Sequence, residues 1–530
     1  MSARRTTCRP LRGALLLVAL CLGGTAHAEP NALQKCAAGK MAAAADLAEG
    51  SVRCFATGVK HGVPVDPRCL QKRTRDFDDA FAKAERLGCF SSGDADDVHR
   101  QVANFIEQTA LLLPDPGLGP DGSDRAERCA AGKLVATGRL ARERLACEQR
   151  AVLARAKAAD KAAANLARCI GVAERKLADA FANLEKKKPA GACATADDAP
   201  THVQTTATLQ RDVVGPLRAV RFSAVLPVLE RSCATTGCHG GGAGAVSPAL
   251  HLDPFAALVG VPAGEAGGAF DLVAPGDAAN SYLLMKVVRD ARIEGDPMDS
   301  PPGVPAVTGT DVALLRAWID AGAPAPAFAE VVAIFTARCQ QAACHGAVQP
   351  QAGLRLDESP YAAVVGVASS QRPALKLVEK GTAASSWLWQ KVAGQTGDGT
   401  LAHGGLSAVE QSVIAAWISS GAAPPRFASD VAPLFRGRCE QALCHGPVAP
   451  QQGLRLDLDP YAAIVGVDST ELTAKLVVPG NHAASYLWRK IVNAPGIFGA
   501  QMPVFGGGPT LTAAEQALIA SWISAGAAND

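Results

Sequence analysis

The sequence predicts an all-α protein in which disulfide-stapled helical hairpins precede three tandem helical repeats. Three observations favour this fold class. Aromatic residues make up only 5% of the 530-residue chain, whereas small residues that suit close helix packing are abundant. Cysteines recur at helical spacing between positions 36 and 193. A segment of about 100 residues then occurs three times between residues 221 and 528.

The N-terminal segment 1–28 has the pattern of an export signal. Four arginines between positions 4 and 12 form a basic region, and the segment 14–24 is apolar but too short to span a bilayer. The tripeptide AHA, which ends at Ala28, predicts cleavage there; a lipoprotein signal at Cys21 is disfavoured by the bulky Leu20 before it. We therefore expect a periplasmic, cell-surface or secreted protein, with no membrane span once the signal is removed.

The composition argues against a surface for nucleic acid or for anionic membranes. The net charge is +2, and charged residues make up 19% of the chain. A chain of 530 residues is too long for one hydrophobic core, so we expect about three to five domains. The predicted segments are a signal at 1–28, helical hairpins at 31–113 and 126–195, and repeats at 221–324, 328–423 and 427–528.

The two hairpins are predicted from a duplicated cysteine pattern. The segment KCAAGK at 35–40 returns as RCAAGK at 128–133. A second cysteine follows at the same interval in each copy, from Cys36 to Cys54 and from Cys129 to Cys147. This interval makes about five whole turns of α-helix, so both thiols lie on one side of the same helix. A second helical stretch follows in each copy, at 70–87 and at roughly 152–187.

Two antiparallel helices stapled in this way predict nested disulfides, as suits an exported chain. The expected pairs are Cys36–Cys89, Cys54–Cys69, Cys129–Cys193 and Cys147–Cys169. No cluster of ligand-type residues accompanies these cysteines. We therefore interpret this part as a stapled helical stalk, with 114–127 and 190–215 as linkers.

Each repeat is predicted to be mostly helical. An amphipathic segment leads to a cysteine motif, a Leu-Asp signature follows, and a final helix closes the repeat. That closing helix opens with a capping pattern, at Thr308–Asp311, Ser407–Glu410 and Thr512–Glu515. It runs through a tryptophan and stops at a glycine; the tryptophans are Trp318, Trp417 and Trp522.

The cysteine motif of the repeats indicates a covalent cofactor. It reads SCATTGCHG at 232–240, RCQQAACHG at 338–346 and RCEQALCHG at 438–446. Two thiols can add to the two vinyl groups of a haem, and an imidazole next to the second thiol can ligate the iron. With these motifs the repeats resemble the cytochrome c family, and more closely its planctomycete-type modules, over about 310 residues. The common family motif has two residues between the cysteines, whereas this chain has four.

The resemblance implies three covalently bound haem c groups. The attachment residues would be Cys233, Cys238, Cys339, Cys344, Cys439 and Cys444. The proximal iron ligands would be His239, His345 and His445.

The resemblance also implies a distal iron ligand, commonly a methionine, and counting within the repeats locates candidates. Each repeat has a lysine in a third shared block, and twelve residues after it stand Met298, His403 and Met502. The middle repeat thus has a histidine in this register, and its loop from there to the closing tryptophan is six residues shorter. Either His403 is the distal ligand, or the middle iron has no sixth ligand from the protein.

An exported array of three haems implies electron transfer, with a redox partner protein that the sequence does not identify. Two other functions stay open: a peroxidase-like enzyme with an open middle haem, and a haem-free envelope scaffold in which the Cys-x4-Cys pairs form short disulfides. Zinc or copper on the Cys, His and Met side chains is a further alternative. The other histidines, expected at the surface or at helix caps, are His61, His99, His202, His251 and His482.

Overall fold

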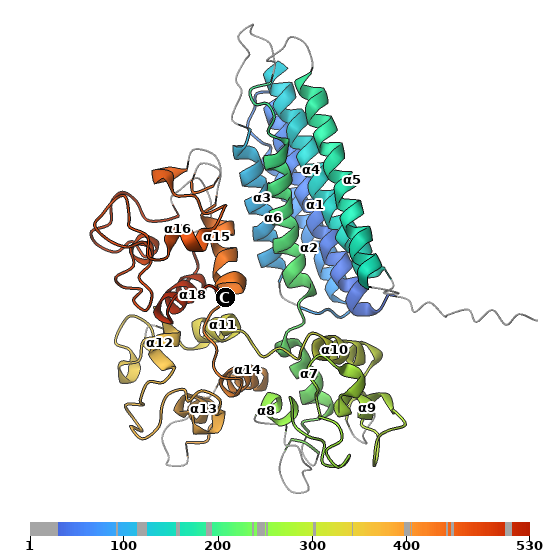
Figure 1. The fold of residues 1–530 in the computed structure, drawn as a ribbon, viewed down its shortest axis with the longest axis vertical. Coiled ribbons are helices and arrows are strands. Elements are labelled where there is room, and N and C mark those ends of the chain that lie inside the picture. Colours follow the sequence, from blue (N-terminus) through green and yellow to red (C-terminus); the bar gives the residue numbers. More distant parts are fainter. Residues whose placement is uncertain are drawn as a thin grey trace, which may run out of the picture.

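The protein is described from a computed structural model. It covers residues 30–530 except for 92–93, 114–124, 155–158, 187–192, 236–237, 241–249, 251–252, 300–303, 342, 397–402, 404, 441–443, 447–449 and 504–510. The all-α prediction is confirmed, because the described residues form helices and isolated β-bridges but no strand. Long helices gather in an N-terminal bundle, and shorter helices form three repeats beside and below it (Figure 1).

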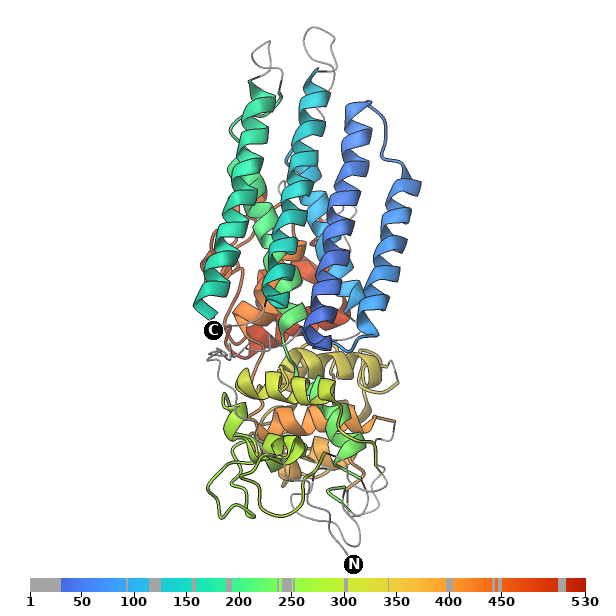
Figure 2. The ribbon, with the colours of Figure 1, turned by 90° about the vertical axis from the view of Figure 1, so that its right-hand side faces the viewer.

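The bundle consists of two units of three helices each. The first unit has α1 (Ala32–Lys60), α2 (Pro67–Glu85) and α3 (Ala95–Leu111), and the second has α4 (Arg125–Leu153), α5 (Ala159–Glu185) and α6 (Ala199–Arg218). Helices α1 and α4 pack against each other, α2 flanks α1, and α5 flanks α4 (Figure 2). Helices α3 and α6 pack together and against these, so the apolar faces of both units share one core.

All four predicted disulfides are confirmed. The pairs Cys36–Cys89 and Cys129–Cys193 both have Cα–Cα distances of 5.4 Å. The inner pairs are Cys54–Cys69, at 6.0 Å, and Cys147–Cys169, at 5.9 Å. The nesting follows from helix geometry, because two cysteines about five whole turns apart on one helix face can each meet a cysteine of the antiparallel neighbour.

The prediction of a linker at 190–215 is wrong in its larger part. Helix α6 begins at Ala199 and continues to Arg218, so the second unit extends well beyond residue 195. Leu209, Val213 and Leu217 recur at four-residue spacing and are buried, which gives this polar, threonine-rich segment one apolar stripe. The part of the other predicted linker at 114–124 lies outside the described residues, and Arg125 already belongs to α4.

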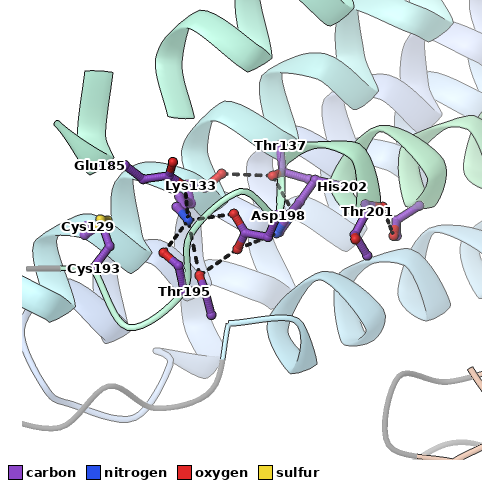
Figure 3. Close-up of polar contacts among 10 residues, drawn as sticks. Cys129, Lys133, Thr137, Glu185, Cys193, Thr195, Asp198, Thr201 and His202 are labelled. Carbon is purple, nitrogen blue, oxygen red and sulfur yellow. Dashed lines mark hydrogen bonds and ion pairs between the residues drawn. A yellow bond between two sulfur atoms is a disulfide. The ribbon is translucent and has the colours of Figure 1, made fainter. Parts of the chain in front are cut away.

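A buried lysine sits one helical turn after the first cysteine of each unit. Lys133 is fully buried, and its Nζ lies 2.7 Å from Glu185 and 2.6 Å from Asp198 and donates to the Thr195 carbonyl at 2.9 Å (Figure 3). The first unit repeats this arrangement, since Lys40 is buried and pairs with Glu85 and Asp94. Each lysine therefore ties the first helix of its unit to the segment that leads into the third.

The expectation that His202 is a surface or capping residue is wrong. Its side chain is fully buried, and its Nδ1 shares a hydrogen bond of 2.9 Å with the Thr137 hydroxyl (Figure 3). Its ring also packs edge-on against Phe181. Burial lowers the pKa of His202 from 6.5 to about 4. His61, by contrast, is exposed at the C-cap of α1 as predicted, and His251 lies outside the described residues.

The three repeats share one order of short helices. The first repeat has α7 (Phe222–Ser232), α8 (Pro254–Leu258), α9 (Tyr282–Val288) and α10 (Gly309–Asp320). The second has α11 (Phe328–Arg338), α12 (Pro360–Val364), α13 (Trp387–Val392) and α14 (Ala408–Ser419). The third has α15 (Ala432–Arg438), α16 (Pro460–Ile464), α17 (Tyr486–Ile491) and α18 (Ala513–Ser524), with a π-helical turn at Phe427–Val431 before α15. Short 3₁₀ turns lie at Ala278–Asn280, Gln351–Gly353, Ala383–Ser385 and Gln451–Gly453.

The closing helix is the centre of each repeat's core. Its tryptophan is buried and packs on a phenylalanine of the first helix, with ring centroids 5.2–5.4 Å apart. The indole N–H donates to the carbonyl six residues further on in all three repeats, at 3.2, 3.0 and 2.9 Å. The three predicted capping boxes at the start of these helices are also confirmed.

The repeats stack through the same contact twice. Helix α14 of the second repeat packs on α7 and α8 of the first, and α18 of the third packs on α11 and α12 of the second. The third repeat then lies against the bundle, where α15 meets α3 (Figure 1). In the part of the chain that the structure describes, no helix combines the length and the apolar character needed to cross a membrane.

Candidate cofactor-attachment sites

The Cys-x4-Cys-His motifs begin where the first helix of each repeat ends. Helices α7, α11 and α15 stop one residue before the first cysteine, whose N–H still donates to the carbonyl four residues back at 2.7–2.9 Å. The N–H of the histidine then donates to the carbonyl of that first cysteine, at 3.1, 3.0 and 3.1 Å in the three repeats. The chain therefore turns back on itself, which brings His239, His345 and His445 next to Cys233, Cys339 and Cys439.

The Leu-Asp signature holds the other side of each histidine. The carbonyls of His239, His345 and His445 accept a hydrogen bond from the N–H of Leu250, Leu356 and Leu456, at 2.7, 2.8 and 2.8 Å. These leucines are buried in the repeat cores. The signature thus anchors the motif loop to the core in every repeat.

In the second repeat the imidazole of His345 is oriented by the backbone. Its Nδ1 lies 3.0 Å from the carbonyl oxygen of Leu354, which fits an N–H donor at Nδ1 and a lone pair at Nε2. This is the tautomer in which Nε2 can ligate a metal. The ring of His403 lies nearby, with ring centroids 5.9 Å apart and ring planes 23° from parallel. The structure therefore brings the two predicted ligands of the middle repeat together.

In the third repeat burial affects the pKa of His445. Burial lowers the pKa of His445, and the backbone carbonyls of Leu454 and Gln451 oppose this in part by favouring the charged ring. A lowered pKa leaves the imidazole neutral at pH 7, which is the form that binds metals.

The first repeat contains a cavity in which all of its predicted ligands meet. The cavity has a volume of about 430 Å³, and Cys233, Cys238, His239 and Met298 all line it. Most of its other lining residues are apolar, including Leu250, Leu258, Val261, Leu272 and Leu283. An apolar cavity with a few converging donor atoms is the usual form of a cofactor site.

The register of the distal candidates is the same in all three repeats. The N–H groups of Met298, His403 and Met502 donate to the carbonyls of Lys286, Lys391 and Lys490, at 3.0, 2.8 and 2.9 Å. The lysine that serves as a counting landmark in the sequence is thus the backbone partner of the candidate ligand. Because the bond is common to all three repeats, the shorter loop of the second repeat has not moved His403 out of position.

The lysine also shapes the loop that carries the distal candidate, a role that sequence reasoning missed. Lys286 is buried, and its Nζ donates to the carbonyls of Glu294 and Asp296 at 2.5 and 3.1 Å. Lys490 does the same with Phe498 at 2.7 Å. The sequence signal that could have revealed this role is a lysine at the same position of the third shared block in all three repeats.

The six motif cysteines are free thiols, whereas the eight cysteines of the bundle are paired. The short disulfides Cys233–Cys238, Cys339–Cys344 and Cys439–Cys444 of the alternative interpretation are therefore not formed in the structure. Burial raises the pKa of Cys233 and of Cys339 to about 11 and that of Cys439 to about 12, so these thiols stay protonated at neutral pH. They lack the electropositive setting of a catalytic nucleophile.

The donor set fits haem better than a small metal ion. Within the described residues, no three or more His, Cys, Asp or Glu side chains are grouped so that they could hold a metal ion. Zinc sites in proteins use three or four such ligands. Paired thiols, a neutral imidazole and a thioether or second imidazole are instead the set that c-type haem uses.

Comparisons with family models, with curated proteins and with solved structures found no match for this chain. The assignment of the sites therefore depends on the residues and the geometry given above.

Proposed function

We propose that this protein is a multihaem c-type cytochrome that transfers electrons through three covalently bound haems. The observation that carries the proposal is the cavity of the first repeat, where two thiols, a histidine and a methionine from distant parts of the sequence meet. The other repeats place the same residue types in the same backbone register, which supports the same function for each.

Different residues of each repeat would attach the haem and ligate its iron. Cys233 and Cys238 would attach the haem, and His239 and Met298 would ligate its iron; the equivalent residues would act in the other repeats. Haem supplies a one-electron redox centre when it is bound. The apolar cavity wall would keep water away from that centre, and the buried lysine would hold the distal loop in place.

The proximity of the His345 and His403 rings favours an electron carrier over a peroxidase. A peroxidase needs an iron that its substrate can reach. If both histidines held the middle haem, they would close that access.

Four disulfides in the bundle are typical of proteins made in an oxidising compartment. Together with the expected signal at 1–28, which lies outside the described residues, they support a periplasmic, cell-surface or secreted location.

The haem content of the full chain tests the proposal. The chain would be produced in a bacterial periplasm together with a c-type haem attachment system, beside a known cytochrome as a loading control. A pyridine haemochrome assay should give three haems per chain, and the intact mass should exceed that of the processed polypeptide by three haems. The double variant Cys233→Ala/Cys238→Ala should retain two haems, whereas Cys54→Ala/Cys69→Ala in the bundle should retain three. A chain without haem, in cells that load the control, would contradict the proposal.

A further inference from the structure

The contact between neighbouring repeats is built from small residues of the closing helix. On α18 the residues buried at the contact are Ala517, Ala520 and Ser521, and on α14 the equivalent residues are Ser412, Ala415 and Ala416. Small side chains let the closing helix approach the preceding repeat closely. The contact is therefore a defined docking geometry that the chain uses twice.

The receiving surface of each contact is formed by the first helix of a repeat and by the short helix that follows the Leu-Asp signature. In the second repeat, Ser359 and Tyr361 are only 6% and 8% exposed under α18, and the N–H of Tyr361 donates to the Ser521 hydroxyl at 3.4 Å. In the first repeat, Asp253 occupies the position of Ser359 and accepts a hydrogen bond from the Ser419 hydroxyl of α14.

The third repeat has the same receiving surface but no closing helix on it. Leu458 is 75% exposed, and Asp459, which stands where Ser359 stands in the second repeat, is exposed as well. The bundle contacts α15, the counterpart of α7 and α11, where Arg436 pairs with Asp212, and it leaves Leu458 and Asp459 exposed. Figure 1 shows α16 on the side of α15 away from the bundle.

At the other end of the stack, in the first repeat, charged residues of the closing helix disfavour docking on another repeat. Helix α10 of the first repeat has exposed Arg316 and Asp320 where α14 has the buried Ala415 and the partly buried Ser419. If α10 of a second copy docked on α16, Asp320 would take the position of Ser419 and face Asp459, and two carboxylates would repel each other. This repulsion therefore disfavours end-to-end stacking of two copies of the chain.

We propose that the surface of Leu458, Asp459 and α16 binds a closing helix of a partner protein, one that presents Ala and Ser as α14 and α18 do. We infer this occupant from the two contacts inside the chain, because in both of them a closing helix covers the equivalent surface. A partner with such a helix is a module of the same fold. That the partner exchanges electrons rests on the proposed function, whereas the docking surface itself does not.

The test uses the chain's own helices as probes. A fluorescently labelled peptide of residues 511–528, which contains α18, is titrated with the full-length protein and followed by fluorescence anisotropy. Saturable binding is expected. Leu458→Arg in the protein should weaken binding at least tenfold, whereas Val348→Arg, at an exposed site of the second repeat, should leave it unchanged.

A second pair of peptides tests the role of charge. A peptide of residues 307–324, which contains α10, should bind at least tenfold more weakly than the α18 peptide. The substitutions Arg316→Ala and Asp320→Ser in that peptide should restore binding.

Several results would overturn the proposal. Equal binding of the α18 peptide to the wild-type and Leu458→Arg proteins would mean that the peptide binds elsewhere. A dimer of the full chain in light scattering that Leu458→Arg abolishes would make the occupant a second copy. Because peptide binding and haem content are measured separately, either result is distinguishable from a failure of the proposed function.

Discussion

His202 shows how one buried side chain makes stability depend on pH. The folded protein holds its ring neutral next to Thr137, Asp198, Lys133 and Phe181, and burial lowers its pKa from 6.5 to about 4. Between these values the unfolded chain binds a proton that the folded chain does not. Stability should therefore fall as the pH falls through this window.

The size of this effect can be predicted. One proton contributes about 1.4 kcal/mol per pH unit, so the free energy of unfolding should drop by about 3 kcal/mol between pH 6.5 and pH 4 through His202. The first unit has Ala44 and Val98 at the positions of Thr137 and His202, which makes Thr137→Ala/His202→Val the matched variant. Urea unfolding at both pH values should show a smaller drop for the variant, and an equal drop would contradict the prediction.

His403 decides the properties of the middle site. An imidazole is a stronger donor to ferric iron than a thioether, so the middle haem of the proposed cytochrome should have the lowest potential of the three. His403→Met should raise that potential by on the order of 0.1–0.3 V and leave the other two unchanged. A redox titration followed by optical spectra measures this.

The contrary outcome for His403 is equally specific. If His403 did not ligate, the ferrous protein should bind carbon monoxide at one haem in three, and His403→Met would leave that binding in place. Three equal potentials without carbon monoxide binding would contradict both interpretations of this position.

At the scale of elements, an arginine at the end of each first helix links it to the closing helix. Arg231, Arg338 and Arg438 pair with the capping-box carboxylates Asp311, Glu410 and Glu515. The same carboxylate thus caps the closing helix and binds the helix that carries the cysteine motif. These pairs join residues 72–80 positions apart, so the spacing of the sequence did not reveal them.

The burial of the pair predicts its contribution to stability. The side chains of Arg438 and Glu515 are 4% and 14% exposed, whereas that of Arg338 is 50% exposed. Arg438→Met would leave a buried carboxylate without its partner and should cost about 3 kcal/mol or more. Arg338→Met should cost less than about 1 kcal/mol. Urea unfolding of both variants measures the difference. Similar losses of stability in the two variants would show that burial does not determine how much the ion pair contributes to stability.

At the scale of the whole molecule, the stacking of the repeats sets their spatial order. The second repeat lies between the other two and is held on both sides by closing-helix contacts. Two such contacts place the three repeats in one continuous array. The third repeat also packs against the bundle, where Gln108 and Asp212 contact Arg436.

A large side chain in a stacking contact should separate the repeats. Ser521 is fully buried between the second and third repeats, so Ser521→Arg should displace α18 and increase the radius of gyration in small-angle X-ray scattering. Val348→Arg is the control, because Val348 is 63% exposed and lies outside the helices that form the stacking contacts. An unchanged radius of gyration for Ser521→Arg would show that the contact does not hold the repeats together.

Features that depend on local spacing could be predicted from the sequence without the fold. Cysteines about five whole turns apart on one helix were enough to predict all four disulfides. Internal repetition likewise located the capping boxes and the common register of Met298, His403 and Met502, because equivalent residues of three copies must occupy equivalent positions.

The remaining features depend on tertiary contacts. Helix α6 contains threonines and prolines, which are poor helix formers, and packing against α4 and α5 overrides that preference. The buried pairs of Lys40 and Lys133, the burial of His202 and the stacking of the repeats all join residues far apart in the chain. Their free energy comes from desolvation and from partners that meet only in the folded protein, so no local pattern of residues encodes them.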